Sequence, residues 1–359
     1  MIVKNEAHIL ERCLESVLPY IDAWAICDTG STDGTQELVR KLLAGVPGTL
    51  AQDSWVDFGT NRTHGLELAR KYACDYTLVI DADEVLVVED PKALAGLDKD
   101  AYRVEMHHSD GMAWPRVNLL RTALPWRYRG IIHEHAECEP PVQEWQLSGV
   151  YMWTDGHGAR GQDPDKALKD LAVMRRSVEL EPENSRYWFY LAQGYEVAKL
   201  VGEAKATYEH RITLGGNPDE VWYSRFRLAQ LLAYQGEWER AVPAYLEAYA
   251  SDPGRIEPLF YLAQGYINRG QDYVAMVFLE AVALGIKPVG AMFVDEPVYD
   301  YLRWLQYAIT AQNTGDTEAA RDVAARLLAS GKAPTQYHEV LTRLLSPTVT
   351  LEAPEAAMA

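Results

Sequence analysis

The chain is poor in cysteine, and its four cysteines do not form a CxxC pair. Disulfide-stabilised secreted domains and zinc knuckles need cysteines that are more numerous or closer together, so the sequence excludes both classes. It also has no run of about eighteen apolar residues, so we expect no membrane span. Residues 1–6 lack the charged and apolar regions of a signal peptide. These features together predict a protein of the reducing cytoplasm.

Positive charge is scarce as well. Asp and Glu outnumber Lys and Arg by 52 to 34, which gives a formal net charge of -18. An acidic surface repels the phosphate backbone, so we expect no nucleic-acid partner. Hydrophobic residues make up 48% of the 359 residues, a globular composition. At ~150 residues per domain, the length predicts about two domains.

Residues 1–160 alternate strand and helix patterns. Apolar runs at Ala23–Cys27 and Tyr76–Ile80 predict buried strands, and apolar residues at helical spacing from Ile9 to Leu18 predict a helix. Further helices are expected at residues 38–43 and 66–73, and strands at 1–3, 102–106, 117–121 and 148–153. The strand–helix–strand order predicts an α/β domain with a mostly parallel sheet.

From residue 161 to residue 345, helix patterns follow one another without strands. Alanines recur in pairs twelve residues apart, at Ala192 and Ala204, Ala229 and Ala241, Ala263 and Ala275, and Ala308 and Ala320. A period near ~34 residues, with small residues at fixed positions, resembles tetratricopeptide repeats. We expect three to four repeats after a first helix at residues 166–180, with an insertion at residues 285–297. Residues 346–359 are expected to fray.

Two acidic motifs follow the predicted strands. Asp28 opens the segment Asp-Thr-Gly-Ser-Thr-Asp-Gly-Thr, and Asp81-Ala82-Asp83-Glu84 follows the second strand. The ligand crevice of an open α/β sheet lies at the carboxyl ends of its strands. Paired carboxylates there suit a divalent cation that holds a nucleotide diphosphate, because Mg²⁺ and Mn²⁺ prefer oxygen ligands. If the chain stays extended, Asp81 and Asp83 point to one side.

The glycines of the first motif allow the strand to end in a tight turn. Asp33 is then the expected N-cap of the next helix. A plain strand–turn–helix connection remains the alternative for this segment. Asp28 is harder to explain in that way, because a carboxylate at a buried strand end is costly without a partner. Glu84 is expected either to orient a ligand or to be exposed.

The order and spacing of residues 2–6 (Ile-Val-Lys-Asn-Glu) and the two acidic motifs resemble glycosyltransferase family 2. The resemblance covers roughly residues 1–160, and the repeat region is similar to that of a subgroup of the family. It implies a Rossmann-like catalytic domain of the GT-A type. It also implies metal-dependent, inverting transfer of a sugar from a nucleotide sugar, expected to be a UDP-sugar, to an acceptor.

The resemblance also implies a set of donor-binding residues. They are Val3, Asn5, Glu6, Asp28, Gly30, Ser31, Asp33, Asn61, Arg62, Asp81, Ala82 and Asp83. Asp81 and Asp83 would bind the sugar diphosphate and Mn²⁺ or Mg²⁺, and His157 would be a third metal ligand. A capping or loop role is the alternative for His157, and a solvated helix end is the alternative for Asn61 and Arg62.

An inverting transferase needs a general base that deprotonates the acceptor. The usual base of the family is a carboxylate in an acidic pair well after the DxD motif, and no such pair is evident here. Glu134, in Gly-Ile-Ile-His-Glu-His, is the first candidate, and Asp110 is the second. A purely structural role for Glu134 stays open.

Two other functions also stay open. A sugar-phosphate nucleotidyltransferase binds nucleotides on an α/β sheet, but its first-strand loop is usually glycine-rich, and residues 2–6 contain no glycine. An inactive, repeat-based binding protein is the other alternative. Because a solenoid offers an extended concave surface, the expected acceptor is a protein or peptide, with saccharide and lipid-linked acceptors left open. The repeats could instead form a homodimer.

Overall fold

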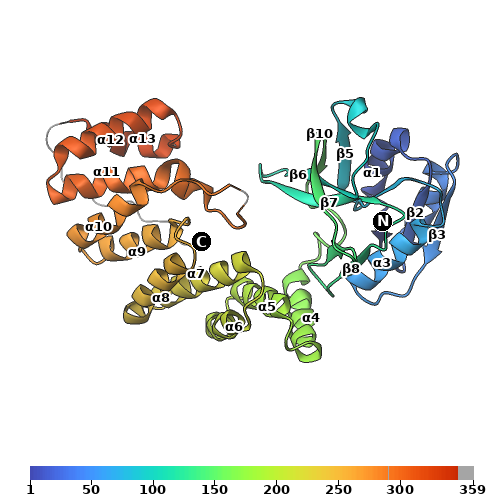
Figure 1. Ribbon diagram of the computed structural model, residues 1–359, viewed down its shortest axis with the longest axis horizontal. Coiled ribbons are helices and arrows are strands. Elements are labelled where there is room, and N and C mark those ends of the chain that lie inside the picture. Colours follow the sequence, from blue (N-terminus) through green and yellow to red (C-terminus); the bar gives the residue numbers. More distant parts are fainter. Residues whose placement is uncertain (290, 347–359) are drawn as a thin grey trace. The chain divides into compact units, whose positions relative to one another are not determined.

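The computed structural model describes residues 1–289 and 291–346, which form two compact units (Figure 1). The first unit is Met1–Ser177 and combines strands with helices, and the second begins at Val178 and is helical. The division lies inside helix α4 (Lys166–Leu180), whereas the sequence analysis placed it at residue 160. The expected frayed tail lies outside the described residues from residue 347 onward.

A parallel three-stranded sheet carries the first acidic motif. Its order is β1-β2-β3, and the register places Val3 beside Asp28 and Asp28 beside Gln52. The strands are β1 (Ile2–Val3), β2 (Trp24–Asp28) and β3 (Gly48–Gln52), and the helices between and after them are α1 (Leu10–Val17), η1 (Leu18–Tyr20), α2 (Thr35–Leu42) and α3 (Phe58–Ala69). The three carboxyl ends therefore meet at one edge, where a ligand crevice was predicted.

A second, five-stranded sheet has the order β4-β7-β6-β10-β5. Its elements are β4 (Tyr76–Leu78), β5 (Glu84–Val88), η2 (Pro91–Leu94), β6 (Ala101–His108), β7 (Ala113–Arg121) and β10 (Glu144–Thr154), and a separate hairpin contains β8 (Arg127–Arg129) and β9 (His135–Glu137). Only β6 and β10 run parallel; the other pairings are antiparallel. The expected parallel arrangement thus holds in the first sheet alone, because the short β6–β7 turn permits only an antiparallel pair.

The helix α1 illustrates how the apolar spacing builds the core of the first unit. Its buried side chains are Leu10, Cys13, Leu14 and Val17, which share one face at intervals of three and four residues. Cys13 and Val17 pack toward the five-stranded sheet, and Leu10 and Leu14 pack with the β2 and α2 side chains. Each fully buried side chain of this size contributes about 1.5–3 kcal/mol.

The second unit consists of helix pairs. The helices are α5 (Ser185–Val197), α6 (Val201–Leu214), α7 (Pro218–Tyr234), α8 (Trp238–Ser251), α9 (Glu257–Ile267), α10 (Asp272–Ala283), η3 (Val298–Leu302), α11 (Arg303–Thr314), α12 (Thr317–Ser330), η4 (Thr335–Tyr337) and α13 (His338–Leu344). All eight alanines of the predicted register are 0% exposed. Gly236, Gly270 and Gly315 turn the chain between paired helices with φ of 77°, 69° and 94°. The predicted tetratricopeptide arrangement is confirmed: small residues let the two helices of each pair approach closely.

The predicted insertion folds back onto the repeats. Residues 284–289 and 291–295, after α10, belong to neither a helix nor a strand. The ring of Phe293 stacks on Tyr223 of α7 with a centroid distance of 4.4 Å. The Arg255 guanidinium donates to the carbonyls of Met292 and Phe293 at 3.0 and 2.9 Å. Met292 and Phe293 of the insertion are therefore held against α7 and Arg255 of the helical unit.

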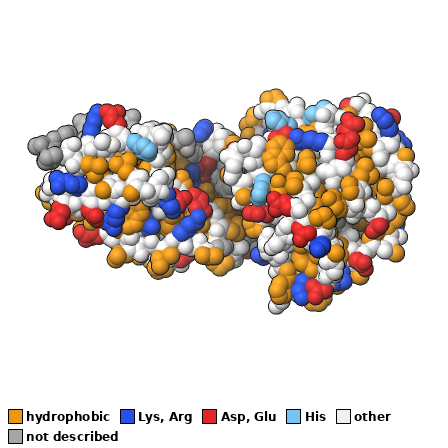
Figure 2. Space-filling model, turned by 90° about the horizontal axis from the view of Figure 1, so that it is seen from above, with side chains coloured by type: hydrophobic (Ala, Val, Ile, Leu, Met, Phe, Trp, Pro, Cys, Tyr) orange, Lys and Arg blue, Asp and Glu red, His pale blue; other side chains and the backbone are white. Residues whose placement is uncertain are grey.

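In the part of the chain that the structure describes, no helix combines the length and apolar character needed to cross a membrane. On the face shown in Figure 2, Lys and Arg side chains are interspersed with Asp and Glu. A mixed surface of this kind fits the acidic composition.

Candidate functional site

Asp28 ends β2 as a buried and fully paired carboxylate. It is 1% exposed. The Ser31 N–H donates to both of its oxygens at 3.0 and 3.2 Å, and Gln36 Nε2 donates to Oδ2 at 2.5 Å. These bonds compensate the cost of burying the charge. Asp28 therefore shapes the loop above it, and the loop itself, from Gly30 to Gly34, remains more exposed.

The loop after β1 is hydrogen-bonded to the loop after β2. Asn5 N–H donates to Ser31 Oγ at 2.9 Å, and Asn5 Oδ1 accepts from the Thr32 N–H at 2.8 Å. Further along, the Ala7 N–H donates to Asp33 Oδ2 at 3.0 Å. Two segments that the sequence assigned to the nucleotide are thus brought together at the carboxyl ends of β1 and β2.

Asp33 does not occupy the N-cap position that we expected. Gly34, with φ of 94°, is the N-cap of α2, because this left-handed conformation favours glycine. The Asp33 carboxylate instead accepts hydrogen bonds from the Thr35 N–H at 3.1 Å and the Thr35 hydroxyl at 2.6 Å. Although burial favours the neutral acid, the hydrogen bonds from Thr35 and Ala7 hold the pKa of Asp33 below its usual value.

The second acidic motif forms a turn rather than an extended strand end. β4 ends at Leu78, and the Glu84 N–H donates to the Asp81 carbonyl at 3.1 Å. The expected alternation therefore does not apply, because it requires an extended chain. Asp81 and Asp83 accordingly meet different partners.

Asp81 is the centre of an ion-pair network. The Arg62 guanidinium donates to both Asp81 oxygens, at 2.7 and 3.0 Å, and its Nε donates to Glu134 at 2.6 Å. Arg116 lies 3.8 Å from Asp81. Burial alone would raise the pKa of Asp81, but the charges of Arg62 and Arg116 lower it to about 2. The structure thus joins Arg62, Asp81 and Glu134, which the sequence predicted without linking them.

Arg116 and Glu84 are part of this network, and the sequence analysis missed their pairing. Glu84 is 4% exposed, so it is not the exposed residue that we considered. It accepts hydrogen bonds from Arg116 at 2.7 Å and from the Asp81 N–H at 2.9 Å. The available signal was an arginine directly before the strand predicted at residues 117–121, because an arginine that becomes buried there needs a carboxylate partner.

Asp83 faces the loop that follows β10. An added methyl group at Gly158 would lie 3.3 Å from Asp83 Cγ, and the adjacent Ala159 N–H donates to Glu6 at 3.0 Å. Burial raises the pKa of Asp83, and the charge of Asp81 raises it further. Burial likewise raises the pKa of Glu6, which the Asp83 charge also raises. Within the described residues, neither carboxylate has a Lys, Arg or His ion pair.

His157, the predicted third metal ligand, is in this same loop after β10. Its side chain is 69% exposed, and its Nδ1 is 3.2 Å from Asp155, which Arg12 also holds at 2.6 Å. Among the described residues, Asp81, Asp83 and His157 do not bring three ligand atoms within 4.8 Å of one another. The metal role of His157 therefore stays a prediction.

The remaining predicted residues have local contacts. Asn61 is 2% exposed, and its amide accepts from the Val56 N–H at 3.0 Å and donates to the Ser54 carbonyl at 3.1 Å. Asp110 lies at the tip of the β6–β7 hairpin, where it accepts from the Met112 N–H at 3.0 Å. Buried Val3, buried Ala82 and Gly30, with φ of 104°, shape the backbone of their loops. Asp110 and Asn61 thus lie outside the Arg62 network.

Comparison with known proteins identifies the family. The model of the family described as "Glycosyl transferase family 2" matches residues 1–115, which include both acidic motifs. A TPR repeat-containing protein of Synechococcus elongatus is 39% identical over 295 residues, covering 76% of this chain and 71% of the relative. The chain belongs with the TPR repeat-containing proteins, and its N-terminal part, residues 1–115, matches glycosyltransferase family 2.

Two solved structures of repeat proteins are similar to about half of this chain. A tetratricopeptide repeat protein from Parabacteroides merdae has 16% identity and a TM-score of 0.39, covering 50% of this chain and 66% of its own. YrrB, a TPR protein with an unusual peptide-binding site, has 16% identity and a TM-score of 0.36, covering 50% of this chain and 83% of its own.

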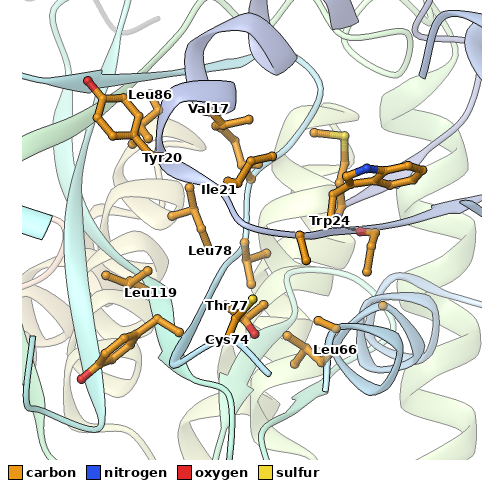
Figure 3. Close-up of a pocket in the computed structure, with 18 of the residues that line it drawn as sticks. Val17, Tyr20, Ile21, Trp24, Leu66, Cys74, Thr77, Leu78, Leu86 and Leu119 are labelled. Atoms are coloured by element: carbon orange, nitrogen blue, oxygen red, sulfur yellow. Dashed lines mark hydrogen bonds between the residues drawn. The ribbon is translucent and has the colours of Figure 1, made fainter. Parts of the chain in front are cut away.

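A cavity of about 300 Å³ lies in the first unit. Apolar side chains that include Val17, Ile21, Leu78 and Leu119 line much of it (Figure 3), and Arg62 of the ion-pair network is also among its lining residues. Among the described residues, Asp83 and Glu6 are not part of this lining. The carboxylates that could hold a divalent cation lie instead at the polar edge around Asp83.

Proposed function

We propose that the α/β unit transfers a glycosyl group from a nucleotide sugar, a UDP-sugar, to an acceptor, with Asp83 as a ligand of Mn²⁺ or Mg²⁺. The observation that carries the proposal is the contrast between the two aspartates of the second motif. Asp81 is paired with Arg62. Burial raises the pKa values of Asp83 and Glu6, and neither carboxylate forms an ion pair with a cationic side chain in the part of the chain that the structure describes.

The residues around Asp83 fit a divalent cation. Mg²⁺ and Mn²⁺ prefer carboxylate oxygens. A cation would offset the burial that chiefly raises the pKa of Asp83 and Glu6, and also the repulsion from neighbouring carboxylates that raises both further. When bound, such an ion supplies positive charge that offsets the charge of the departing nucleoside diphosphate. Glu6, assigned from the sequence to the donor, thus becomes a second candidate ligand.

We assign the nucleotide to the paired loops after β1 and β2. Asp28 is fully used in shaping the loop, so direct contacts to base and ribose fall to exposed positions between Gly30 and Gly34. The glycines there allow a ligand to approach the backbone closely. Removal of the Asp28 carboxylate would weaken nucleotide binding through the loop it holds.

Glu134 is the proposed general base. Arg62 Nε donates to Glu134 Oε1, and a terminal nitrogen of the same guanidinium donates to Asp81. The guanidinium therefore fixes the position of the Glu134 carboxylate relative to that of Asp81. In the transfer, an acceptor hydroxyl gives its proton to Glu134 as its oxygen bonds to the anomeric carbon. The bond from that carbon to the phosphate oxygen breaks, and its electron pair leaves with the nucleoside diphosphate.

The acceptor that we propose is a protein or peptide bound by the repeat unit, because stacked helix pairs offer an extended surface for a chain. The four cysteines are unpaired with one another, which supports a reducing cytoplasmic location.

A donor panel tests the function. The protein is incubated with individual nucleotide sugars and Mn²⁺, and released nucleoside diphosphate is measured. We expect release with at least one donor, loss of release with a chelator, and Asp83→Asn to weaken Mn²⁺ binding by ~10-fold or more. Asp163→Asn is the matched control. It alters a half-buried carboxylate paired with Lys169 and should leave nucleotide release and Mn²⁺ binding unchanged. No metal-dependent turnover or binding of any donor would contradict the proposal.

A further inference from the structure

Three metal-ligating side chains of different kinds meet on the parallel sheet, away from Asp83. Cys27 is in β2, Asp53 directly follows β3, and His64 is in α3. One ligand atom from each, the Cys27 sulfur, an Asp53 oxygen and a His64 nitrogen, all lie within 4.8 Å of one another. None of the three has a part in the proposed transfer.

The fold holds these side chains in place. The β2–β3 register pairs Cys27 with Ala51, and the Asp53 N–H donates to the Asp28 carbonyl at 2.8 Å, which extends the pairing by one residue. α3 packs closely on this strand end, since a Cβ at Gly65 would lie 3.8 Å from Cys27 Sγ. The ligand atoms therefore approach one another because of packing that is independent of any ion.

Two of the three side chains are in direct contact with each other. His64 Nδ1 is hydrogen-bonded to Asp53 Oδ2, and Cys27 Sγ lies within 4.8 Å of a ligand atom of each. Cys27 is 0% exposed, and burial raises the pKa of its thiol to about 11. A buried, protonated thiol is a poor nucleophile, so the triad does not suit covalent catalysis. Displacement of the thiol proton by a metal ion, by contrast, would create a thiolate bonded to that ion.

We propose that Cys27, Asp53 and His64 bind a zinc-class divalent cation. Thiolate, carboxylate and imidazole are the three side-chain ligand types that Zn²⁺ uses, and water can complete a tetrahedral set. The thiolate distinguishes this site from the all-oxygen site around Asp83, since Mg²⁺ and Mn²⁺ favour oxygen ligands. Solvent reaches the site through His64 and Asp53, whose side chains are 40% and 19% exposed. The bound ion would link β2, β3 and α3 beneath the Asp28 loop.

Cobalt titration of the purified, metal-free full chain under reducing conditions tests this proposal. Co²⁺ bound by a thiolate gives a charge-transfer band in the near ultraviolet, and Zn²⁺ should displace it. We expect one equivalent of Co²⁺ to produce the band, and a proton to be released as the Cys27 thiol is deprotonated. Cys27→Ser should abolish the band, and Asp53→Asn or His64→Asn should weaken Co²⁺ binding by ~10-fold or more.

Three further variants keep the test decisive. Cys13→Ser changes another fully buried cysteine and should retain the band, as should Asp83→Asn at the oxygen-ligand site. His64→Cys supplies a second thiolate and should restore binding with a stronger band, which a merely structural role of His64 would not do. Circular dichroism of each metal-free variant checks folding. Absence of the band in the wild type, or its persistence with unchanged affinity in His64→Asn, would overturn the proposal. Neither result bears on donor turnover.

Discussion

At the level of single residues, Arg62 connects the parts of the candidate site. Its guanidinium binds Asp81 from the turn after β4 and Glu134 from the segment between β8 and β9. It also lies over the Tyr128 ring, 5.7 Å from the ring centre. Because a guanidinium donates from a rigid plane, the relative position of its two carboxylates is set by one side chain.

The depressed pKa of Asp81 predicts a pH-dependent contribution to stability. The folded pKa is about 2, below the ordinary 3.8, so the ionised carboxylate stabilises the folded state. This contribution is complete above about pH 4 and is lost as the pH falls through about 2. We expect Asp81→Asn to lower the free energy of unfolding at pH 7 by about 2 kcal/mol, with the difference shrinking toward pH 2. Urea unfolding of both proteins across this range measures it; a gap independent of pH would contradict the assignment.

At the level of elements, α3 determines where Arg62 and His64 lie. Its N-cap, Asp57, accepts from the Thr60 N–H at 2.6 Å, which fixes the start of the helix. The Gly59 N–H then donates to the Gly130 carbonyl at 3.2 Å. α3 therefore begins in contact with the segment that leads to Glu134.

Gly59 and Gly65, both in α3, give a matched pair of substitutions. A Cβ at Gly59 would lie 2.4 Å from the Gly130 carbonyl oxygen, whereas a Cβ at Gly65 meets its nearest atom at 3.8 Å. We expect Gly59→Ala to destabilise the fold by about 1–3 kcal/mol, because backbone atoms must move. Gly65→Ala should be neutral or stabilising by up to ~1 kcal/mol, since alanine favours a helix. Thermal unfolding of both variants distinguishes them; equal effects would contradict the close contact.

The helical unit contains a fully buried ion pair, whose loss we expect to lower the free energy of unfolding more than the loss of an exposed pair. Arg255 and Glu257 are each 0% exposed and lie 2.9 Å apart. Arg255→Ala leaves the Glu257 charge without its partner, so we expect a loss of about 3–5 kcal/mol in unfolding free energy. Arg240→Ala breaks pairs of a 56% exposed arginine and should cost under ~1 kcal/mol. Denaturant unfolding measures both, and a small effect at Arg255 would show that Glu257 finds another partner.

At the level of the whole molecule, the chain consists of two compact units with separate cores. Apolar clusters of the first unit contain residues of its two sheets, and those of the second contain residues of its helices. All residues of the proposed donor site belong to the first unit. Donor chemistry and recognition of a protein acceptor can therefore reside in different units.

A chain that ends after Leu180, the last residue of α4, tests this division. We expect it to fold cooperatively and to release nucleoside diphosphate from the donor at a rate similar to that of the full chain. Transfer to the protein acceptor should be lost with the repeats. Circular dichroism and nucleotide release measure the first two properties. Failure of the truncated chain to fold would show that the units depend on each other.

The sequence by itself determined the features that depend on local spacing. The alanine register predicted the helix pairs, because it recurs with the repeat period and places one small residue on each of two successive helices, which can then approach closely. Apolar runs followed by acidic residues located β2 and β4, because short apolar runs of this kind are typical of buried strands. The candidate site was predicted as separate residues: Arg62, Asp81 and Glu134 were each named.

Only the tertiary structure decided which side chains are partners. Arg62 is 19 residues from Asp81 and 72 from Glu134 in the sequence, and no periodicity relates them. The turn at Asp81 separates the two aspartates that an extended strand would have aligned. The meeting of Cys27, Asp53 and His64 likewise requires β2, β3 and α3 to pack. Long-range packing sets these distances, so charge pairing and pKa values follow from the fold and not from the local pattern.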